Sequence, residues 1–305
     1  MKVFITGGTG FVGTYLSRRL VQEGHQVSIL TRDARKVPLE HPGISYVVGD
    51  PTQEGPWMGA VPEADWIINL AGASIFTRWT AGHKQEIMGS RLRTTHNLVT
   101  ALAAGDRRQL FCSTSAVGYY GPRGEETLTE DSQADDGFLG DVAKAWEAEA
   151  LKARDLGIRT VITRFGIVLG RDGGALGKMV PLFKKFLGGP LGKGLQWFSW
   201  IHQEDQARAF LFIKDHPELV GPVNFTAPKP VRHRELAQAL GRALHRPALM
   251  PAPAFLIRLV MGEFGDTLLT GQKVLPQRLL DAGFEFKFPA IEAALEDLLG
   301  DGGKR

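Results

Sequence analysis

Residues 1–13 read MKVFITGGTGFVG and join an apolar run to a glycine-rich turn and a helical pattern. The apolar run is typical of a buried strand. Gly7, Gly10 and Gly13 have the spacing of a pyrophosphate-binding turn. We expect Gly7 to permit the tight turn, Gly10 to let the backbone approach phosphate, and Gly13 to let the helix pack on the strand. This context predicts a dinucleotide site, with a simple glycine-rich connection as the alternative.

The end of the second apolar strand, at Thr31, bears on the choice of nicotinamide cofactor. An NAD site usually places Asp or Glu about 20 residues after the glycines, on the ribose 2′-hydroxyl. Here Arg32 follows Thr31. A guanidinium pairs with a 2′-phosphate, which a carboxylate would repel. We therefore expect NADP(H) rather than NAD(H). Asp33 would serve an NAD site if the turn shifts by one residue, and a solvated basic loop is the other alternative.

The composition is that of an enzyme-sized globular protein. The chain has 305 residues, enough for a large core that divides into two lobes. The formal net charge of +3 comes without a long basic run, which argues against nucleic acid as a partner. Cys112 is the only cysteine, so no intrachain disulfide can form. The eight histidines are dispersed, and the sequence indicates no metal site.

The N-terminal residues lack the charged leader and cleavage site of a secretory signal. No apolar run approaches the length that spans a bilayer. We therefore expect a cytoplasmic protein with no membrane partner, acting on a small molecule that the sequence does not identify.

Apolar runs alternate with helical patterns over the first 165 residues. After the two strands already described, the runs fall at 44–49, 65–71, 109–114 and 159–165, and the helical patterns at 82–104 and 137–156. Strands that are apolar on both faces indicate a parallel sheet covered by helices on each side. Right-handed crossovers then give an α/β fold, a doubly wound parallel sheet of the Rossmann type. Its ligands bind at the carboxyl ends of the strands.

Beyond Gly166 the pattern is less regular, with glycine-rich loops and helices interrupted by prolines. We predict a Rossmann domain over residues 1–170, to whose sheet later segments can return. Residues 171–300 are predicted to form a smaller, less regular C-terminal substrate lobe. That lobe would include a small helical C-terminal domain from about residue 250.

Motifs along the whole chain resemble those of the extended short-chain dehydrogenase/reductases. They are TGGTGFVG at 6–13, NLAG at 69–72, STS at 113–115, YYG at 119–121 and WIHQED at 200–205. More closely, the chain is similar to the atypical subgroup labelled "epimerase family" or NAD-dependent epimerase/dehydratase. The marks of that subgroup are RWT at 78–80, SR at 90–91, GGAL at 173–176, GKGLQ at 192–196, NFTAP at 224–228 and HRP at 245–247.

The resemblance implies positions for an NADP(H) cofactor. The turn would hold the pyrophosphate through Gly7, Thr9, Gly10, Phe11, Val12 and Gly13. Thr31 and Arg32 would hold the 2′-phosphate, and Asp50 would approach the adenine. The ribose and nicotinamide side would be lined by Leu70, Ala71 and Gly72. Arg78 would reach a phosphate. The alternatives are a turn residue for Asp50 and a surface guanidinium for Arg78.

The sequence departs from the family at the catalytic residues. The family's reductases use a Ser together with Tyr-x-x-x-Lys on one helix, where the ammonium lowers the pKa of the phenol. In the helical segment 137–147, the Tyr position falls on Leu139 and the Lys position on Ala143. Lys144 lies about 100° around the helix from the expected face. The usual proton relay is therefore missing.

Three side chains are candidates for catalysis. Ser115, at the end of a strand, would bond a substrate oxygen, or else cap the strand. Tyr120, in the loop that follows, would supply a phenol from another direction, or else pack. His202, in the segment that lines the substrate cavity of extended reductases, would act there, or else be structural.

Several charged residues have two interpretations each. Arg164, at the end of a strand beside the expected cofactor site, would contact the ligand, or else form an ion pair that fixes a helix to the sheet. Arg91 and Arg93 carry the same alternatives, and either would favour an anionic substrate if it faces the site. Asp141 and Glu147 are expected at the surface, with an acid or base role if buried.

Tryptophans near the expected site suggest an aromatic wall for a planar or sugar-like ligand. The residues concerned are Trp79, Trp197 and Trp200, whereas Trp146 is expected to pack within its helix layer.

These features predict an NADP(H)-binding oxidoreductase or epimerase-like enzyme that acts on a small-molecule carbonyl or alcohol, with Ser115 as the main polar anchor. The missing Tyr and Lys favour the alternative, a non-catalytic NADPH-binding protein that senses redox state or holds a partner protein. An RNA-binding reductase is disfavoured because basic residues are not interleaved with aromatic ones.

Overall fold

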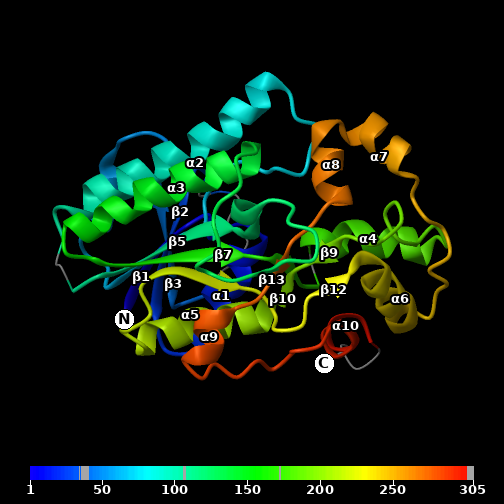
Figure 1. The fold of residues 1–305 in the computed structure, drawn as a ribbon. Coiled ribbons are helices and arrows are strands. Elements are labelled where there is room, and N and C mark those ends of the chain that lie inside the picture. Colours follow the sequence, from blue (N-terminus) through cyan, green and yellow to red (C-terminus); the bar gives the residue numbers. More distant parts are fainter. Residues whose placement is uncertain (34, 36–40, 106–107, 172, 301–305) are drawn as a thin grey trace.

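Seven parallel strands form the central sheet of the computed structural model, which describes residues 1–33, 35, 41–105, 108–171 and 173–300 (Figure 1). Their order is β11-β7-β5-β4-β1-β2-β3. The bounds are β1 Lys2–Thr6, β2 Gln26–Thr31, β3 Ile44–Val48, β4 Trp66–Asn69, β5 Leu110–Ala116, β7 Arg159–Phe165 and β11 Gly221–Phe225. The order reverses between β1 and β4, which confirms the doubly wound α/β fold.

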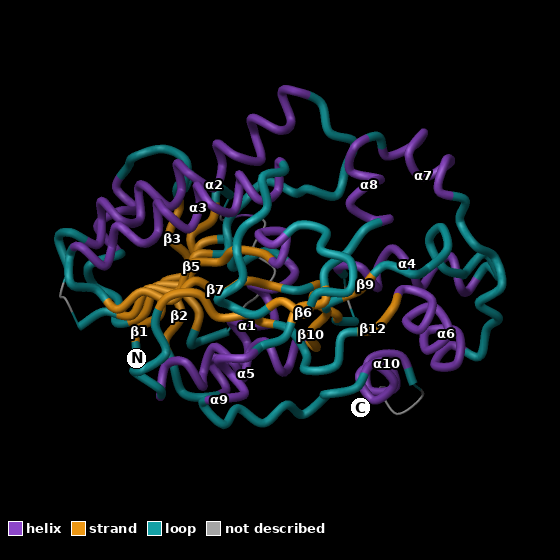
Figure 2. The backbone as a smooth tube through the Cα atoms, in the orientation of Figure 1, coloured by secondary structure: helices purple, strands orange, loops and turns teal. Residues whose placement is uncertain are grey.

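Helices cover both faces of the sheet (Figures 1 and 2). One face carries α1 Phe11–Gln22 and α5 Gln203–Asp215, and the other carries α2 Ala81–Leu102 and α3 Phe138–Asp155. Side chains of β1 alternate between the two layers. Ile5 belongs to the core that includes Leu16 of α1, and Phe4 to the core that includes Leu98 of α2. Burial on both faces explains why the strands are apolar throughout.

Segments beyond residue 170 return to this sheet. Helix α5 covers one face, β11 forms an edge, and α9 Gln277–Asp281 packs against β11. Short strands also tie late segments to early ones, since β13 Lys273–Val274 pairs with β6 Thr127–Leu128. The dinucleotide-type sheet is therefore completed by residues from both halves of the chain.

A smaller, less regular part lies beyond the carboxyl ends of the strands (Figure 1). Its helices are α4 Gly174–Lys184, α6 His233–Leu244, α7 Ala254–Met261, α8 Glu263–Leu269 and α10 Ile291–Leu299. Its short strands are β8 Ile167–Leu169, β9 Trp197–Phe198, β10 Trp200–His202 and β12 Val231–Arg232. The core of this part is separate from the two sheet cores and includes Trp200, Leu236 and Leu295. Two short 3₁₀ segments, η2 Pro56–Ala60 and η3 Val117–Tyr120, complete the fold.

The two parts meet where the glycine turn contacts the loop before α4. A Cβ atom at Gly173 or Gly174 would lie 2.8 Å from the Phe11 ring. Only glycine at these positions leaves room for that ring. In the described part of the chain, no helix is both long and apolar enough to cross a bilayer.

His233, the first residue of α6, should make folding stability depend on pH. Burial lowers the pKa of His233 to about 4 from its ordinary 6.5, and its Nδ1 accepts a hydrogen bond from the backbone N–H of Leu191. Because the unfolded chain binds the proton more tightly, this contribution is present above pH 6.5 and is lost as pH falls toward 4. The loss amounts to about 3 kcal/mol.

Urea denaturation at several pH values would measure this effect. The His233→Asn variant should show a flatter dependence between pH 4 and 6.5 than the wild-type protein. His245→Asn is the matched control, because His245 is exposed and Asn tolerates its left-handed backbone. Equal slopes in the His233 variant and the wild type would contradict the prediction.

Candidate functional site

The glycine turn between β1 and α1 has the geometry expected of a pyrophosphate cradle. Gly7 has a φ of +70°, and a Cβ there would lie 2.8 Å from the carbonyl carbon of Leu70. A Cβ at Gly13 would lie 2.3 Å from the carbonyl oxygen of Gly7, so only glycine allows this approach of helix to turn. These approaches confirm the turn role of Gly7 and the packing role of Gly13, whereas their binding of a pyrophosphate stays a prediction.

The first N–H groups of α1 are open to an anion. Gly10 is the N-cap residue, and no side chain caps the helix. The unsatisfied N–H groups and the positive end of the helix dipole therefore remain available for a phosphate. Thr9, Phe11 and Val12 surround this end of the helix, as the resemblance implies. The cradle fits the pyrophosphate of a dinucleotide, because it combines a glycine-lined approach with free backbone donors.

A buried hydrogen-bond network fixes the carboxyl end of β4 beside the turn. The Thr6 hydroxyl donates to Asn69 Oδ1 at 2.7 Å, and Asn69 Nδ2 donates to Thr95 of α2 and Ser113 of β5 at 3.0 and 3.2 Å. Leu70, Ala71 and Gly72 follow directly in the sequence, next to Gly7. Their place on the ribose and nicotinamide side stays a prediction.

Two arginines lie near Asp50, the residue expected to approach the adenine. Burial raises the pKa of Asp50. Hydrogen bonds from the Thr52 N–H and hydroxyl outweigh this effect and hold that pKa below its ordinary value. Arg32 and Arg93 also lower this pKa, so both guanidinium groups lie near the carboxylate. Asp50 therefore has the turn contacts of the alternative interpretation, and its approach to the adenine stays a prediction.

Asp33 is paired with a neighbouring arginine. Its Oδ1 accepts a hydrogen bond from Arg35 Nε at 3.0 Å, which lowers the pKa of the Asp33 carboxyl group. Thr31 is buried at the end of β2, with its hydroxyl 3.3 Å from the backbone of Asp33, while Arg32 is exposed. Arg32 therefore lies at the surface near Asp50, where a phosphate could reach it from solvent.

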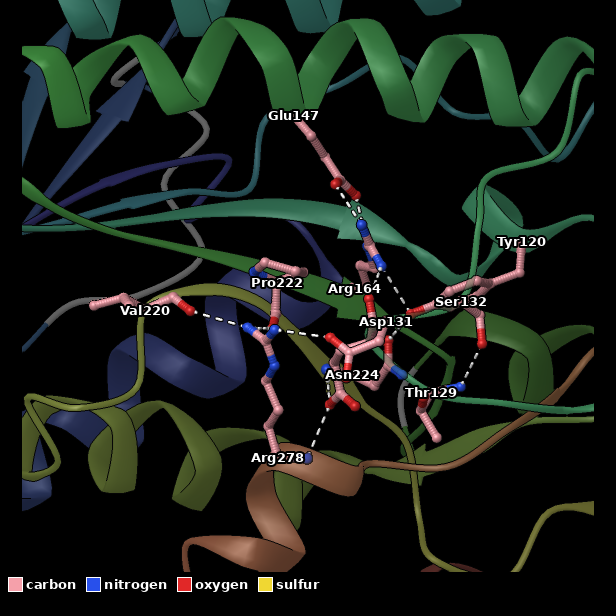
Figure 3. Close-up of polar contacts among 11 residues, drawn as sticks. Tyr120, Thr129, Asp131, Ser132, Glu147, Arg164, Val220, Pro222, Asn224 and Arg278 are labelled. Atoms are coloured by element: carbon pink, nitrogen blue, oxygen red, sulfur yellow. Dashed lines mark hydrogen bonds and ion pairs between the residues drawn. The ribbon is translucent and has the colours of Figure 1, made fainter.

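Ser115 lies at the carboxyl end of β5, where it donates a hydrogen bond to Glu147 Oε1 of α3 at 2.6 Å. Arg164 of β7 donates to both oxygens of the same carboxylate, each at 2.8 Å (Figure 3). Burial lowers the pKa of the Arg164 guanidinium. The hydrogen bonds and charge of Glu147 outweigh this effect and hold that pKa above its usual range. Arg164 thus forms the ion pair that fixes a helix to the sheet, which was the alternative to ligand contact.

Tyr120 is fully buried and shares this network. Its hydroxyl donates to Asn224 Oδ1 at 2.7 Å and accepts from Arg164 Nη1 at 2.9 Å. Burial raises the pKa of Tyr120 to about 12. The phenol is held by structural partners in the middle of the protein, which favours packing over catalysis. A catalytic role for Tyr120 stays a prediction.

Glu130 extends the network to the C-terminal segment. Its Oε1 accepts hydrogen bonds from the backbone N–H groups of Asn224 and Arg278, at 2.9 and 3.3 Å. Burial raises the pKa of the Glu130 carboxyl group. Arg278 in turn donates to Asp131 Oδ1 at 3.1 Å (Figure 3). One chain of contacts therefore joins α3, the sheet and α9.

His202 is buried between α5 and α10. Its Nδ1 accepts a hydrogen bond from the backbone N–H of Glu204 and so caps α5, and its ring lies 4.0 Å from that of Phe288. Its Nε2 faces Asp297 of α10 at 3.4 Å, and burial lowers the pKa of the ring. These contacts favour the structural interpretation of His202.

The three tryptophans do not form one aromatic wall. Trp200 is fully buried in the core of the smaller part, and Trp79 packs in a separate cluster with Phe264 of α8. The guanidinium of Arg232 stacks on Trp197, with Arg232 Cζ 3.9 Å from the centre of the tryptophan ring. The expectation of a shared wall was wrong, because the three side chains face different layers.

Arg78 has the surface position of its alternative interpretation, and Trp146 packs in its helix layer. Arg78 is exposed and lies against Gly262, where an added Cβ would be 3.4 Å from Arg78 Cγ. Trp146 is buried and its Nε1 donates to the Thr95 hydroxyl at 2.9 Å, so it packs between helices as expected.

The surface expectation for Glu147 was wrong, whereas Asp141 is exposed as expected. Glu147 follows Ala143 by four residues and precedes Ala150 by three, so it lies on the buried stripe of α3. That spacing was the signal that could have placed it inside. Glu130 lies in a polar stretch of sequence in which nothing indicates burial.

Fold and turn together define a dinucleotide-binding protein of the Rossmann type, and comparison with known families makes this assignment specific. The chain belongs to the NAD dependent epimerase/dehydratase family, whose model matches residues 3–225. Residues 252–298 match a domain of unknown function, DUF1731. The resemblance to the epimerase subgroup with a small C-terminal domain is therefore confirmed.

Relatives extend over the whole chain. It is 40% identical over 302 residues to the chloroplastic epimerase family protein SDR39U1 homolog of Arabidopsis thaliana, covering 98% of this chain and 87% of that one. It is 39% identical over 308 residues to the epimerase family protein YfhF of Bacillus subtilis, covering 99% of each. The solved human epimerase family protein SDR39U1 (isoform 2), with NADPH, has 34% identity and a TM-score of 0.87, covering 99% of this chain and 100% of that one.

Among the described residues, no group of three or more His, Cys, Asp and Glu side chains is placed to hold a metal ion.

Breaking the buried pair should destabilise the fold strongly. In the Glu147→Gln variant, Arg164 keeps its charge in a site where it is only 3% exposed, without its counter-ion. Removing one partner of a buried pair costs about 3–5 kcal/mol. Urea unfolding would measure the loss. The control is Asp141→Asn on the same helix, whose ion pair is exposed and whose loss should cost less than about 1 kcal/mol. Similar losses in both variants would contradict the role given to Glu147.

Proposed function

We propose that this protein binds NADPH and catalyses hydride transfer to or from a small-molecule carbonyl or alcohol, as an atypical member of its family. When bound, the nicotinamide supplies or accepts the hydride, and the protein supplies binding and orientation. The observation that carries the proposal is the geometry of the glycine turn. The turn packs so closely on Leu70 that no side chain fits at Gly7, as a pyrophosphate-binding turn requires.

The preference for the phosphorylated cofactor is supported by the charges at the end of β2. Arg32 is exposed, and Asp33 is engaged by Arg35. Arg32 and Arg93 together make this corner cationic. A 2′-phosphate gains charge-assisted hydrogen bonds there. The human relative, which shares 34% identity with this chain, is described with NADPH.

Ser115 is the residue proposed to orient the substrate oxygen. It gives its only proton to Glu147, so its oxygen lone pairs remain available to accept a hydrogen bond from a substrate hydroxyl. Arg164 donates a hydrogen bond to each oxygen of the Glu147 carboxylate. The serine is 1% exposed, so the substrate would need to displace its neighbours slightly.

A specific observation favours the second candidate function, a non-catalytic NADPH-binding protein. The family's Tyr and Lys positions are occupied by Leu139 and Ala143, and Ala143 is buried. Tyr120 is a fully buried phenol near Ser115 in sequence, and its hydroxyl is hydrogen-bonded to Asn224 and Arg164. In such a protein the same turn would bind the cofactor without turnover.

Titration calorimetry with NADPH and NADH tests the cofactor assignment. We expect NADPH to bind at least about tenfold more tightly, equal to about 1.4 kcal/mol, and the Arg32→Ala variant to lose this preference. The matched variant Arg35→Ala should keep most of it, since Arg35 is paired with Asp33. Equal binding of both cofactors would reject the NADP assignment and favour Asp33 as a ribose ligand.

Absorbance of NADPH in the presence of small carbonyl compounds tests catalysis. We expect oxidation with at least one class of compound, and a loss of about 100-fold in kcat/KM in Ser115→Ala. Ser45→Ala, at an exposed position of β3, is the control. Tight NADPH binding without turnover of any compound would favour the non-catalytic alternative.

A further inference from the structure

Arg91 of α2 lies directly against the chain that leaves β4. A Cβ added to Gly72 would be 3.1 Å from Arg91 Cζ and 3.3 Å from its Nη2. Arg91 Nη1 donates hydrogen bonds to the carbonyl oxygens of Ala73 and Ile87, at 3.1 and 2.9 Å. One nitrogen therefore holds the backbone after β4, and the opposite edge of the guanidinium faces Gly72.

This guanidinium has no counter-ion in the described part of the chain. No carboxylate there pairs with Arg91, and its Nε and Nη2 have no hydrogen-bond partner among those residues. Burial lowers the pKa of Arg91 to about 10, so it remains a cation at neutral pH. A partly buried charge without a partner is unfavourable, and an anionic ligand would remove the penalty.

Arg164 shows how the same protein treats a structural arginine. Its guanidinium is 3% exposed and is neutralised by Glu147 through two hydrogen bonds. Among the described residues, Arg91 of α2 has only backbone carbonyls as hydrogen-bond partners, with the Trp146 ring as a further neighbour. The difference between the two indicates that the partner of Arg91 comes from outside the chain.

The position of Arg91 relates it to the missing lysine. Its Cζ lies 5.0 Å from the ring centre of Trp146 of α3. Trp146 follows Ala143, the family's lysine position, by three residues and therefore lies on the same side of the helix. The cation from α2 thus stands close to the helix face from which the family's ammonium would project. Gly72, which contacts it, is on the side predicted to line the nicotinamide ribose.

We propose that Arg91 binds an acidic group of the substrate, a carboxylate or a phosphate, beside the nicotinamide. The substrate would then be an anionic carbonyl or alcohol compound, held by the Nε and Nη2 edge in the bidentate manner that guanidinium groups favour. This inference rests on the proposed function, since it needs the cofactor in the adjacent cradle. The other source of an anion is the pyrophosphate of the cofactor itself.

Binding of inorganic phosphate and of oxalate to the NADPH-saturated protein, measured by calorimetry, tests the proposal. We expect at least one of them to bind the wild-type complex, and Arg91→Met to weaken that binding by tenfold or more. Arg91→Lys, which keeps a point charge without the bidentate edge, should show a smaller loss. Affinity for NADPH should stay within twofold in both variants. Arg242→Met is the matched control, because Arg242 forms an exposed ion pair on α6.

Two results would overturn the inference. Loss of NADPH affinity in Arg91→Met would assign the residue to the cofactor pyrophosphate. Absence of anion binding by the wild-type NADPH complex would leave Arg91 as a backbone anchor only. Thermal unfolding shows whether the variants are folded, and Arg91→Lys serves alone if Arg91→Met is not. If the wild-type protein fails to bind NADPH, the proposed function itself fails, which is a different outcome from either of these.

Discussion

The buried ion pair between Arg164 and Glu147 is the interaction on which the arrangement around the strand ends depends. It joins α3 to β7 through two hydrogen bonds, and the same carboxylate accepts the hydroxyl of Ser115 on β5. Arg164 also reaches Tyr120, which leads to Asn224 on β11. A low-dielectric interior makes such a network strong when complete and costly when one member is lost. The polar residues around Ser115 therefore hold the layers together.

The cofactor half of the site depends on a different constraint, the absence of side chains. Gly7 and Gly13 allow the turn, α1 and the end of β4 to come within van der Waals contact of one another. The network through Thr6 and Asn69 then fixes β4 against β1. These contacts leave the uncapped N-terminus of α1 free for an anion. Backbone donors and the helix dipole are thus available for binding an anion, and Arg32 is the side chain proposed to select the cofactor.

Charge is treated differently at three arginines along the same sheet edge. Arg164 is neutralised inside the protein, Arg32 is exposed beside Asp50, and Arg91 is partly buried without a carboxylate. Of these three, only Arg164 is paired with a buried carboxylate in the described part of the chain. The family's Tyr and Lys are absent from α3, so any chemistry here relies on orientation and on cations rather than on a phenol held near its pKa. The proposals for cofactor and substrate rest on Arg32 and Arg91, neither of which pairs with a buried carboxylate in the described part of the chain.

The sequence by itself determined the parallel sheet, the glycine turn and the family, because these rest on local patterns. Apolar runs, glycine spacing and strand-end motifs are fixed by neighbours in the chain. Only the tertiary structure decided which polar residues meet. Glu147 lies inside because its stripe of α3 faces β7, the three tryptophans separate into different layers, and β11 completes the sheet from beyond residue 170. The physical reason is that burial and pairing of a charge depend on side chains brought from distant elements, which no local pattern specifies.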